Sequence, residues 1–224
     1  MPRLLPSANS QIRKLTERYL VARETLLSLG FADEADWQES RSLPNLSERE
    51  FLRQAAWTIL ASGFREATVR NLFPRISHAF LNWTTAQRIA RNRKVCERNA
   101  TKVFNYPGKI QAIGSLCERV AYEGFSKIRT NIQLYGIEFL QSFAFIGPIT
   151  SYHLGKNIGL DLVKPDRHLT RLARATGFPS PTHLCLAIAE LTGDKLAVVD
   201  IVLWRYATVR PDFLSLFRVG PSTR

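Results

Sequence analysis

The stretch that decides the fold is FAFIGPITSYHLGKNIGLDLVKPDRHLTR, which spans Phe143–Arg171. It opens with a predicted tight turn, because Gly147 allows a sharp change of direction and Pro148 suits the first position of a helix. An apolar helix and a short loop rich in Gly and Leu follow, and Asp166 then stands at the start of a second helix. The stretch therefore predicts a turn, a helix, a loop and a carboxylate at the next helix start.

The rest of the chain has the apolar spacing of helices. Residues 10–30 place their Leu and Ile side chains near one face, and Ser47 followed by Glu50 predicts a capping box at the start of another helix. Residues 31–44 are polar and acidic and are predicted to form a linker. Further apolar segments of helical period lie at 67–82, 84–104, 108–121, 126–142, 148–158, 166–177, 182–191 and 194–207. No segment alternates as a strand does, so the predicted class is all-α.

The charge of the chain favours a polyanionic partner. The 224 residues contain 31 Lys and Arg against 19 Asp and Glu, which gives a net charge of +12 and a pI of about 10.1. Such an excess favours nucleic acid before an acidic membrane, although a protein that is merely soluble and basic has the same composition. Four of the charges lie within Arg88–Lys94, a run that either follows a DNA strand or forms a solvated helix face.

The cysteines and the hydropathy of the chain indicate the cellular compartment in which the protein is expected. The three cysteines, Cys96, Cys117 and Cys185, argue against a disulfide framework and fit a reducing cytosol. They also exclude a four-cysteine iron–sulfur cluster built from this chain alone. The N-terminal residues lack the apolar core of a signal peptide, and no apolar run approaches the length of a membrane span. We therefore expect a cytoplasmic, nucleoid-associated protein without a membrane partner.

The turn, the helix and the lone carboxylate together resemble the helix-hairpin-helix DNA glycosylases. The hairpin of that superfamily reads Leu-Pro-Gly-Val-Gly before a polar residue; here residues 143–147 read FAFIG, with Phe145 in place of the first glycine. The family aspartate matches Asp166, which is followed by Arg167 and His168 as in Asp-x-His. The similarity is sharp over about 143–172 and diffuse over roughly 47–210.

The resemblance implies a two-lobed helical glycosylase fold with a cleft between the lobes. Residues 1–46 would form an N-terminal helix and linker that pack on the C-terminal lobe. Residues 47–160 would form a central helical lobe that includes the hairpin, and residues 161–224 a C-terminal lobe that carries the aspartate. The partner would be double-stranded DNA and the protein a monomer. No metal and no iron–sulfur cluster are expected, although the resemblance allows a monovalent cation at the hairpin.

The hairpin would anchor the DNA. Free N–H groups at a helix start suit one phosphate, and here they would belong to Ile149, Thr150 and Ser151 after the turn at Gly147. An ordinary helix start explains the same residues. The resemblance adds three further DNA contacts, and these are Lys156, Arg167 and His168.

Asp166 would be the catalytic residue. Breaking the bond between base and sugar develops positive charge on the sugar, and an ionised carboxylate stabilises that charge and orients the attacking water. An Asp at a helix start is also a good N-cap, and both roles are compatible. Bifunctional family members place a lysine where this chain has Ile149, which has no amine to form a Schiff base. The resemblance therefore implies hydrolysis by water without a lyase step.

A flipped base needs a pocket, and the gap that it leaves needs a wedge. Ile149 and His153 lie four residues apart and share one helix face, which by resemblance lines the pocket. Further pocket candidates are Trp57 and Tyr152. The wedge candidates lie in two loops, and they are Tyr106 with Asn105 in one and Phe64 in the other. Each of these aromatic residues is equally explained as part of the core.

Three functional interpretations follow. The first is a monofunctional DNA glycosylase, similar to the 3-methyladenine glycosylases because lysine and cluster are both absent, that repairs an alkylated base. The same chemistry would fit a glycosylase that excises a hypermodified base from foreign phage DNA as a defence. A non-catalytic helix-hairpin-helix module that only binds DNA is the alternative of another class. An RNA-binding helical protein rests on charge alone.

Overall fold

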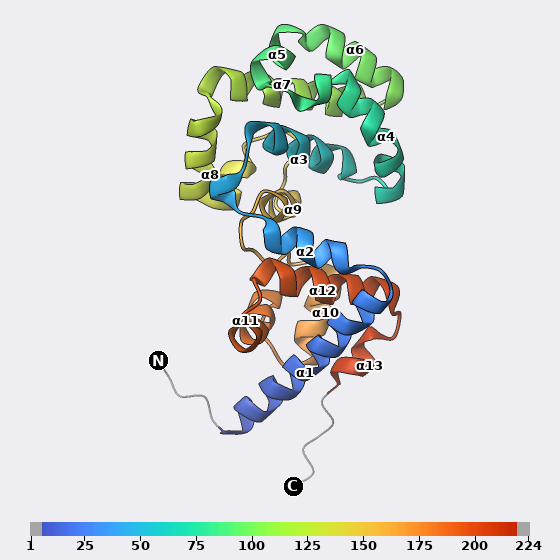
Figure 1. Cartoon of the computed structure of the whole chain (residues 1–224), viewed down its shortest axis with the longest axis vertical. Coiled ribbons are helices and arrows are strands. Elements are labelled where there is room, and N and C mark those ends of the chain that lie inside the picture. Colours follow the sequence, from blue (N-terminus) through green and yellow to red (C-terminus); the bar gives the residue numbers. More distant parts are fainter. Residues whose placement is uncertain (1–5, 219–224) are drawn as a thin grey trace. The chain divides into compact units, whose positions relative to one another are not determined.

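The protein is helical throughout the part that is described. The structure, a computed structural model, describes residues 6–218, with side chains from residue 10 onward. Within these residues no strand is present, which confirms the predicted all-α class (Figure 1). The elements are α1 (Pro6–Ser28), α2 (Ala32–Ser40), η1 (Leu43–Asn45), α3 (Glu48–Ala61), α4 (Glu66–Ala79), η2 (Leu81–Trp83), α5 (Ala86–Arg91), α6 (Arg93–Val103), α7 (Pro107–Glu123), α8 (Phe125–Leu140), α9 (Thr150–Asn157), α10 (Arg167–Ala175), α11 (Pro181–Thr192), α12 (Leu196–Val209) and α13 (Phe213–Phe217).

The segment 31–44 is not a linker, and that prediction is wrong. It contains α2 and the short 3-10 helix η1. Two of the acids that suggested a linker, Asp33 and Glu34, lie in the first turn of α2, where they face the positive end of the helix dipole. Glu34 also accepts hydrogen bonds from the Arg205 guanidinium of α12. The acidic residues of this segment therefore belong to the start of α2, which binds Arg205 through Glu34.

The stretch predicted as one helix at 84–104 is two helices, α5 and α6, which meet at Asn92. A strained turn precedes them, because Leu81, Asn82 and Trp83 all have positive φ angles of 55°, 51° and 60°. The indole of Trp83 is buried and stacks on the Phe80 ring at a centroid distance of 5.2 Å. This packing holds the chain in a conformation that non-glycine residues rarely adopt.

The chain divides into two compact units. We call Arg41–Leu160 the central unit, and Met1–Ser40 together with Asp161–Arg224 the terminal unit. Leu43 and Leu46, which the prediction placed in the N-terminal segment 1–46, belong to the core of the central unit. Their burial attaches the segment that precedes α3 to the central unit.

Helix α3 lies at the middle of the central unit and contacts α4, α5, α7 and α9 (Figure 1). It begins where the capping box was predicted, because the Ser47 hydroxyl accepts a hydrogen bond from the Glu50 N–H at 3.2 Å. Its fully buried Phe51 ring contacts the rings of Phe125 and Phe143 at 5.8 and 6.0 Å. Phe143 comes from the hairpin turn, so the core of this unit fixes the position of that turn.

The end of α9 is held closely against η1. Gly159 has a φ angle of 95°, and a Cβ atom at this position would lie 2.5 Å from the carbonyl carbon of Ser42 and 2.6 Å from the Leu43 nitrogen. Only glycine fits so close to another backbone. This contact ties the first residues of the central unit to the helix that follows the hairpin turn.

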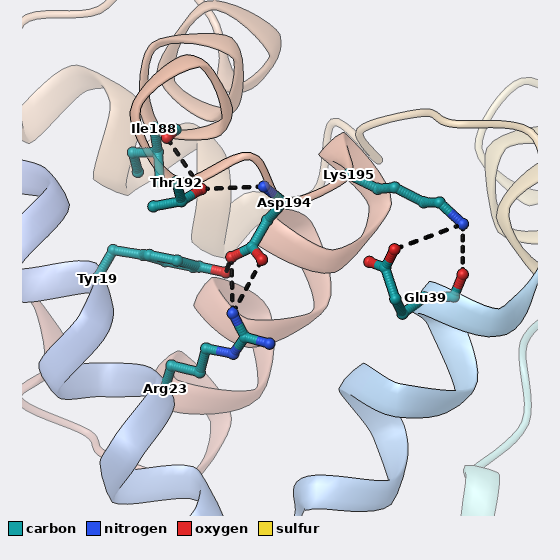
Figure 2. A network of polar contacts seen from close by, with 7 residues as sticks. All are labelled: Tyr19, Arg23, Glu39, Ile188, Thr192, Asp194 and Lys195. Atoms are coloured by element: carbon teal, nitrogen blue, oxygen red, sulfur yellow. Dashed lines mark hydrogen bonds and ion pairs between the residues drawn. The ribbon is translucent and has the colours of Figure 1, made fainter.

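The terminal unit joins the two ends of the chain through a polar network (Figure 2). Asp194, just after α11, accepts hydrogen bonds from the Tyr19 hydroxyl at 2.6 Å and from the Arg23 guanidinium at 2.9 Å, both on α1. Burial, followed by the hydrogen bond to Asp194, raises the pKa of Tyr19 far above its usual range. Nearby, Lys195 forms an ion pair with Glu39 of α2. These contacts attach α1 and α2 to the C-terminal helices.

Candidate nucleic-acid interface

Positive charge is concentrated in the central unit. This unit holds 17 Lys and Arg against 7 Asp and Glu, a net charge of +10, whereas the terminal unit holds 14 against 12, a net charge of +2. The hairpin and both predicted wedge loops belong to the central unit. A polyanion is therefore attracted mainly to the unit that carries these loops.

The hairpin is formed by α8, a turn at 141–149 and α9. Within the turn the residue with a left-handed backbone is Phe145, whose φ angle is 64°, and Gly147 has no positive φ. Gly147 is therefore not the left-handed residue of the turn. Instead, the Gly147 N–H donates to the Thr150 hydroxyl at 2.7 Å, which closes the turn from within.

Of the three N–H groups predicted to face a phosphate, two remain available. The Ser151 N–H donates to the Gly147 carbonyl at 2.9 Å, and the Ser151 side chain is fully buried, so neither group is offered to a ligand. Among the described residues, the N–H groups of Ile149 and Thr150 have no acceptor. Lys156, a further predicted DNA contact, is also buried, at 6% exposure.

The two wedge loops and the hairpin turn meet at one place. The Phe64 ring lies 6.0 Å from the Tyr106 ring, and the Tyr106 ring lies 6.1 Å from the Phe145 ring, both in edge-to-face geometry. All three rings are exposed, as is the neighbouring Asn105. The structure thus brings together residues from three loops that are 39 to 81 positions apart in the sequence.

Lys109 lies beneath these rings and has no role in the sequence prediction. Its side chain is 3% exposed, and its ammonium donates hydrogen bonds to the carbonyls of Ile59 at 2.5 Å, Leu60 at 3.2 Å and Ser62. Burial lowers the pKa of Lys109 to about 8. The three acceptors are carbonyls at the C-terminal end of α3, where helix carbonyls lack partners and the dipole favours a cation. Lys109 therefore joins the start of α7 to the end of α3.

Asp166 lies at the N-terminus of α10 and caps it. Its Oδ1 accepts hydrogen bonds from the N–H groups of His168 at 2.8 Å and Leu169 at 3.0 Å. Its Oδ2 makes no hydrogen bond with the described residues. The preceding loop is anchored to α12, because the Lys164 N–H donates to Asp200 Oδ1 at 3.0 Å. One carboxylate oxygen is thus structural, and the other is uncommitted.

Other predicted site residues have structural partners. The His168 ring lies 5.9 Å from the Phe213 ring of α13, and its Nδ1 is buried without a partner among the described residues. Trp57 packs edge-on against Phe73 of α4 at 5.1 Å, under the guanidinium of Arg70. Trp57 therefore belongs to the interface between α3 and α4, which explains it without a base pocket.

The remaining pocket candidates lie on α9 or at its start. Ile149 is 51% exposed, and the Ile149 carbonyl accepts from the His153 N–H at 3.4 Å, so the two residues lie one turn apart as expected. His153 and Tyr152 are half-buried, and Arg167 in the terminal unit is exposed. Of the predicted pocket residues, Ile149 offers the most surface to a ligand.

The basic run at 88–94 is divided by the structure. Arg93 is bound to Glu97 at 2.6 Å and also to Glu118, so it ties α6 to α7. A Cβ atom on Gly114 of α7 would lie 2.1 Å from the Glu97 carboxylate, so this glycine makes room for the ion pair. The other three cations of the run are exposed and have no ion pair with the described residues; they are Arg88, Arg91 and Lys94.

The described residues contain no group of three or more His, Cys, Asp or Glu side chains that could hold a metal ion. Within the same part of the chain, no helix has both the length and the apolar character needed to cross a membrane. Comparisons of the chain with family models, with curated proteins and with solved structures give no match.

Proposed function

We propose that the protein is a monofunctional DNA glycosylase of the helix-hairpin-helix type, with two lobes and a cleft between them. The observation that carries the proposal is the state of Asp166. Its Oδ1 is used to cap α10, while its Oδ2 makes no hydrogen bond with the described residues, on a loop that is anchored to α12. A carboxylate held in this way can act on a developing positive charge without reorganising.

The mechanism follows from the chemistry of each group. The basic central unit binds the duplex, and the N–H groups of Ile149 and Thr150 take one phosphate. The exposed rings of Tyr106 and Phe64 fill the gap that the extruded base leaves. The carboxylate of Asp166 then stabilises the oxocarbenium-like sugar and orients water toward it. Ile149 has no amine, so the product is an intact abasic site.

A non-catalytic DNA-binding protein is the second candidate. The cap made by Asp166 favours it, because two hydrogen bonds to the start of α10 are reason enough for an Asp at this position. This protein would use the same basic unit and the same hairpin, and would release no base.

The test is the release of free bases from duplex DNA, identified by mass spectrometry. One set of duplexes carries alkylated purines and another carries hypermodified pyrimidines, so the result separates a repair substrate from a phage-derived one. Asp166→Asn is the decisive variant, because Asn caps a helix as well as Asp does but carries no charge. Asp212→Asn, beside α13 in the same unit, is the matched control. If the wild type and Asp212→Asn release a base and Asp166→Asn does not, the glycosylase is supported. If the wild type releases no base, the non-catalytic DNA-binding protein is supported instead.

A further inference from the structure

Three aromatic rings from three loops form an exposed cluster in the central unit. Phe64, Tyr106 and Phe145 are 40%, 41% and 40% exposed, although large aromatic side chains are usually buried. Each ring contacts its neighbour edge-on, and Gly108 lies between two of them, with its Cβ position 3.5 Å from Tyr106 and 3.6 Å from Phe145. The rings are therefore ordered relative to one another and also accessible to a ligand.

The cluster is built on Lys109. The Lys109 ammonium lies 5.0 Å from the Phe64 centroid, 5.8 Å from the Tyr106 centroid and 5.6 Å from the Phe145 centroid. An ammonium has three N–H donors, and here all three go to carbonyls at the end of α3. Lys109 has no donor left for a phosphate. It is a positioning residue that attaches the three rings to one helix end through cation–π contacts.

Packing does not explain the ring of Phe145. The residue is left-handed, with a φ angle of 64°, at a position where glycine would be free of strain. Its ring stays 40% exposed, and it contacts Tyr106, Gly108 and Lys109 instead of the buried core residues. A strained and exposed aromatic residue that is kept in a fixed position is an indication of function.

The surroundings of the cluster identify its ligand. The unit carries a net charge of +10, and the exposed Arg65 follows Phe64 directly in the sequence. Flat apolar rings in a positive environment bind strands whose bases are unpaired, because each base stacks on a ring while its phosphate is attracted to the cations. A fully paired duplex offers no base face to stack on. The ligand that fits is therefore nucleic acid with unpaired bases.

We propose that Phe64, Tyr106 and Phe145 form one base-stacking surface for unpaired nucleotides, that Lys109 assembles it, and that the hairpin contributes a stacking ring as well as a phosphate anchor. The proposal deepens the proposed function, and it rests on DNA binding but not on base release. It assigns Phe145 and Lys109 a role that requires no phosphate contact from either residue.

The test compares the binding of the full chain to single-stranded dT12 and to a fully paired 12-mer by fluorescence anisotropy. Phe145→Gly removes the ring and also relieves the backbone strain, so the variant should remain folded while its affinity for dT12 falls about tenfold. Its affinity for the paired duplex should stay within about twofold, because paired bases have no exposed face to stack on the ring. Tyr122→Leu is the matched control, since this ring is 93% exposed in the same unit but lies outside the cluster.

Lys109→Met tests the assembly of the surface. The methionine keeps the apolar stem but loses the three hydrogen bonds, so affinity for dT12 should fall about as far as in Phe145→Gly while duplex affinity is retained. In the double variant the two losses should not add, because both act through the same rings. Wild-type affinity of Phe145→Gly for dT12, an equal loss for duplex, or strict additivity would each overturn the proposal. These assays need no base excision, so a failed glycosylase test with a positive result here would separate the two proposals.

Discussion

The roles of single residues in this protein depend on the hydrogen bonds of individual atoms and on local backbone conformation. Asp166 has one oxygen on the α10 cap and one oxygen without a partner among the described residues. Lys109 has all three of its N–H donors on helix carbonyls, and Phe145 holds a left-handed backbone at a cost of about 1 kcal/mol. The cap made by Asp166 was predicted from the sequence, whereas the positions of Lys109 and Phe145 were not.

Asp166→Asn should lower the rate of base release by about a thousandfold, because the amide removes the charge that opposes the oxocarbenium ion. Its thermal unfolding should match that of the wild type, since Asn is an equally good cap. Asp166→Ala, which loses the cap as well, should unfold at lower temperature by an amount equivalent to about 1 kcal/mol. Single-turnover release and calorimetry measure the two effects. A folded Asp166→Asn variant with normal release would show that this carboxylate is not catalytic.

The free energy of unfolding should depend on pH through Lys109. Burial lowers the pKa of this lysine from 10.5 to about 8, so between pH 8 and 10.5 the unfolded chain binds more protons than the folded chain. The stability of the wild type should therefore rise through this window relative to Lys109→Met, which has no proton to lose. Denaturant titrations of both proteins at pH 7, 9 and 10.5 measure the difference, in which the contributions of groups common to the two proteins cancel. A constant difference would mean that Lys109 keeps its ordinary pKa.

At the scale of elements, the loops between helices are held by contacts of their own backbone with a side-chain hydroxyl or with another backbone segment. The hairpin turn is closed by Thr150, whose hydroxyl accepts from the Gly147 N–H. The end of α9 is closed by Gly159, over which the backbone of Ser42 passes. Neither contact involves a hydrophobic side chain, so neither appears in the apolar pattern.

Gly159→Ala should destabilise the protein by more than about 2 kcal/mol. The new methyl group would meet the Ser42 backbone at 2.5 Å, in addition to the strain of a left-handed alanine. Gly63→Ala is the control, because Gly63 has a similar φ angle of 76° but nothing within 4 Å of its Cβ position. That variant should lose only about 1 kcal/mol. If chemical denaturation gives equal losses, the approach of Ser42 to Gly159 is not as close as described.

At the scale of the whole molecule, the two units differ in charge and so in their expected share of DNA binding. The central unit has a net charge of +10 and the terminal unit +2, although both hold many arginines. In the terminal unit these cations are balanced by acids, as in the pairs Arg23–Asp194 and Arg205–Glu34. Unbalanced cations, and not their total number, determine the attraction for a polyanion.

Replacing Arg88, Arg91 and Lys94 by Gln should weaken duplex binding and flatten its salt dependence. Each lost phosphate contact lowers the slope of log affinity against log salt by about 0.9. The matched variant replaces three exposed cations of the terminal unit by Gln, and these are Arg13, Lys14 and Arg174. It changes the net charge equally and should leave the slope unchanged. Equal effects of the two triple variants would show that total charge, and not the central unit, controls binding.

The amino-acid sequence by itself determined the helical class, the start of α3 at Ser47 and the absence of the hairpin lysine. Helix periodicity and caps depend on residues within a few positions of one another, which is why they can be predicted locally. The α2 helix escaped prediction because its nine residues are mostly polar and are held by a contact with Arg205, far along the chain.

Only the tertiary structure decided the composition of the candidate site. The carbonyls that bind Lys109 come from residues 47 to 50 positions earlier, and the ring of Phe145 meets Tyr106 across 39 positions. The sequence predicted Phe64 and Tyr106 as separate wedges, and it gave no role to Phe145 beyond replacing the first hairpin glycine. Backbone carbonyls are present at every residue and leave no signal in a sequence. The packing of the helices therefore determines which carbonyls accept hydrogen bonds from the buried Lys109 ammonium.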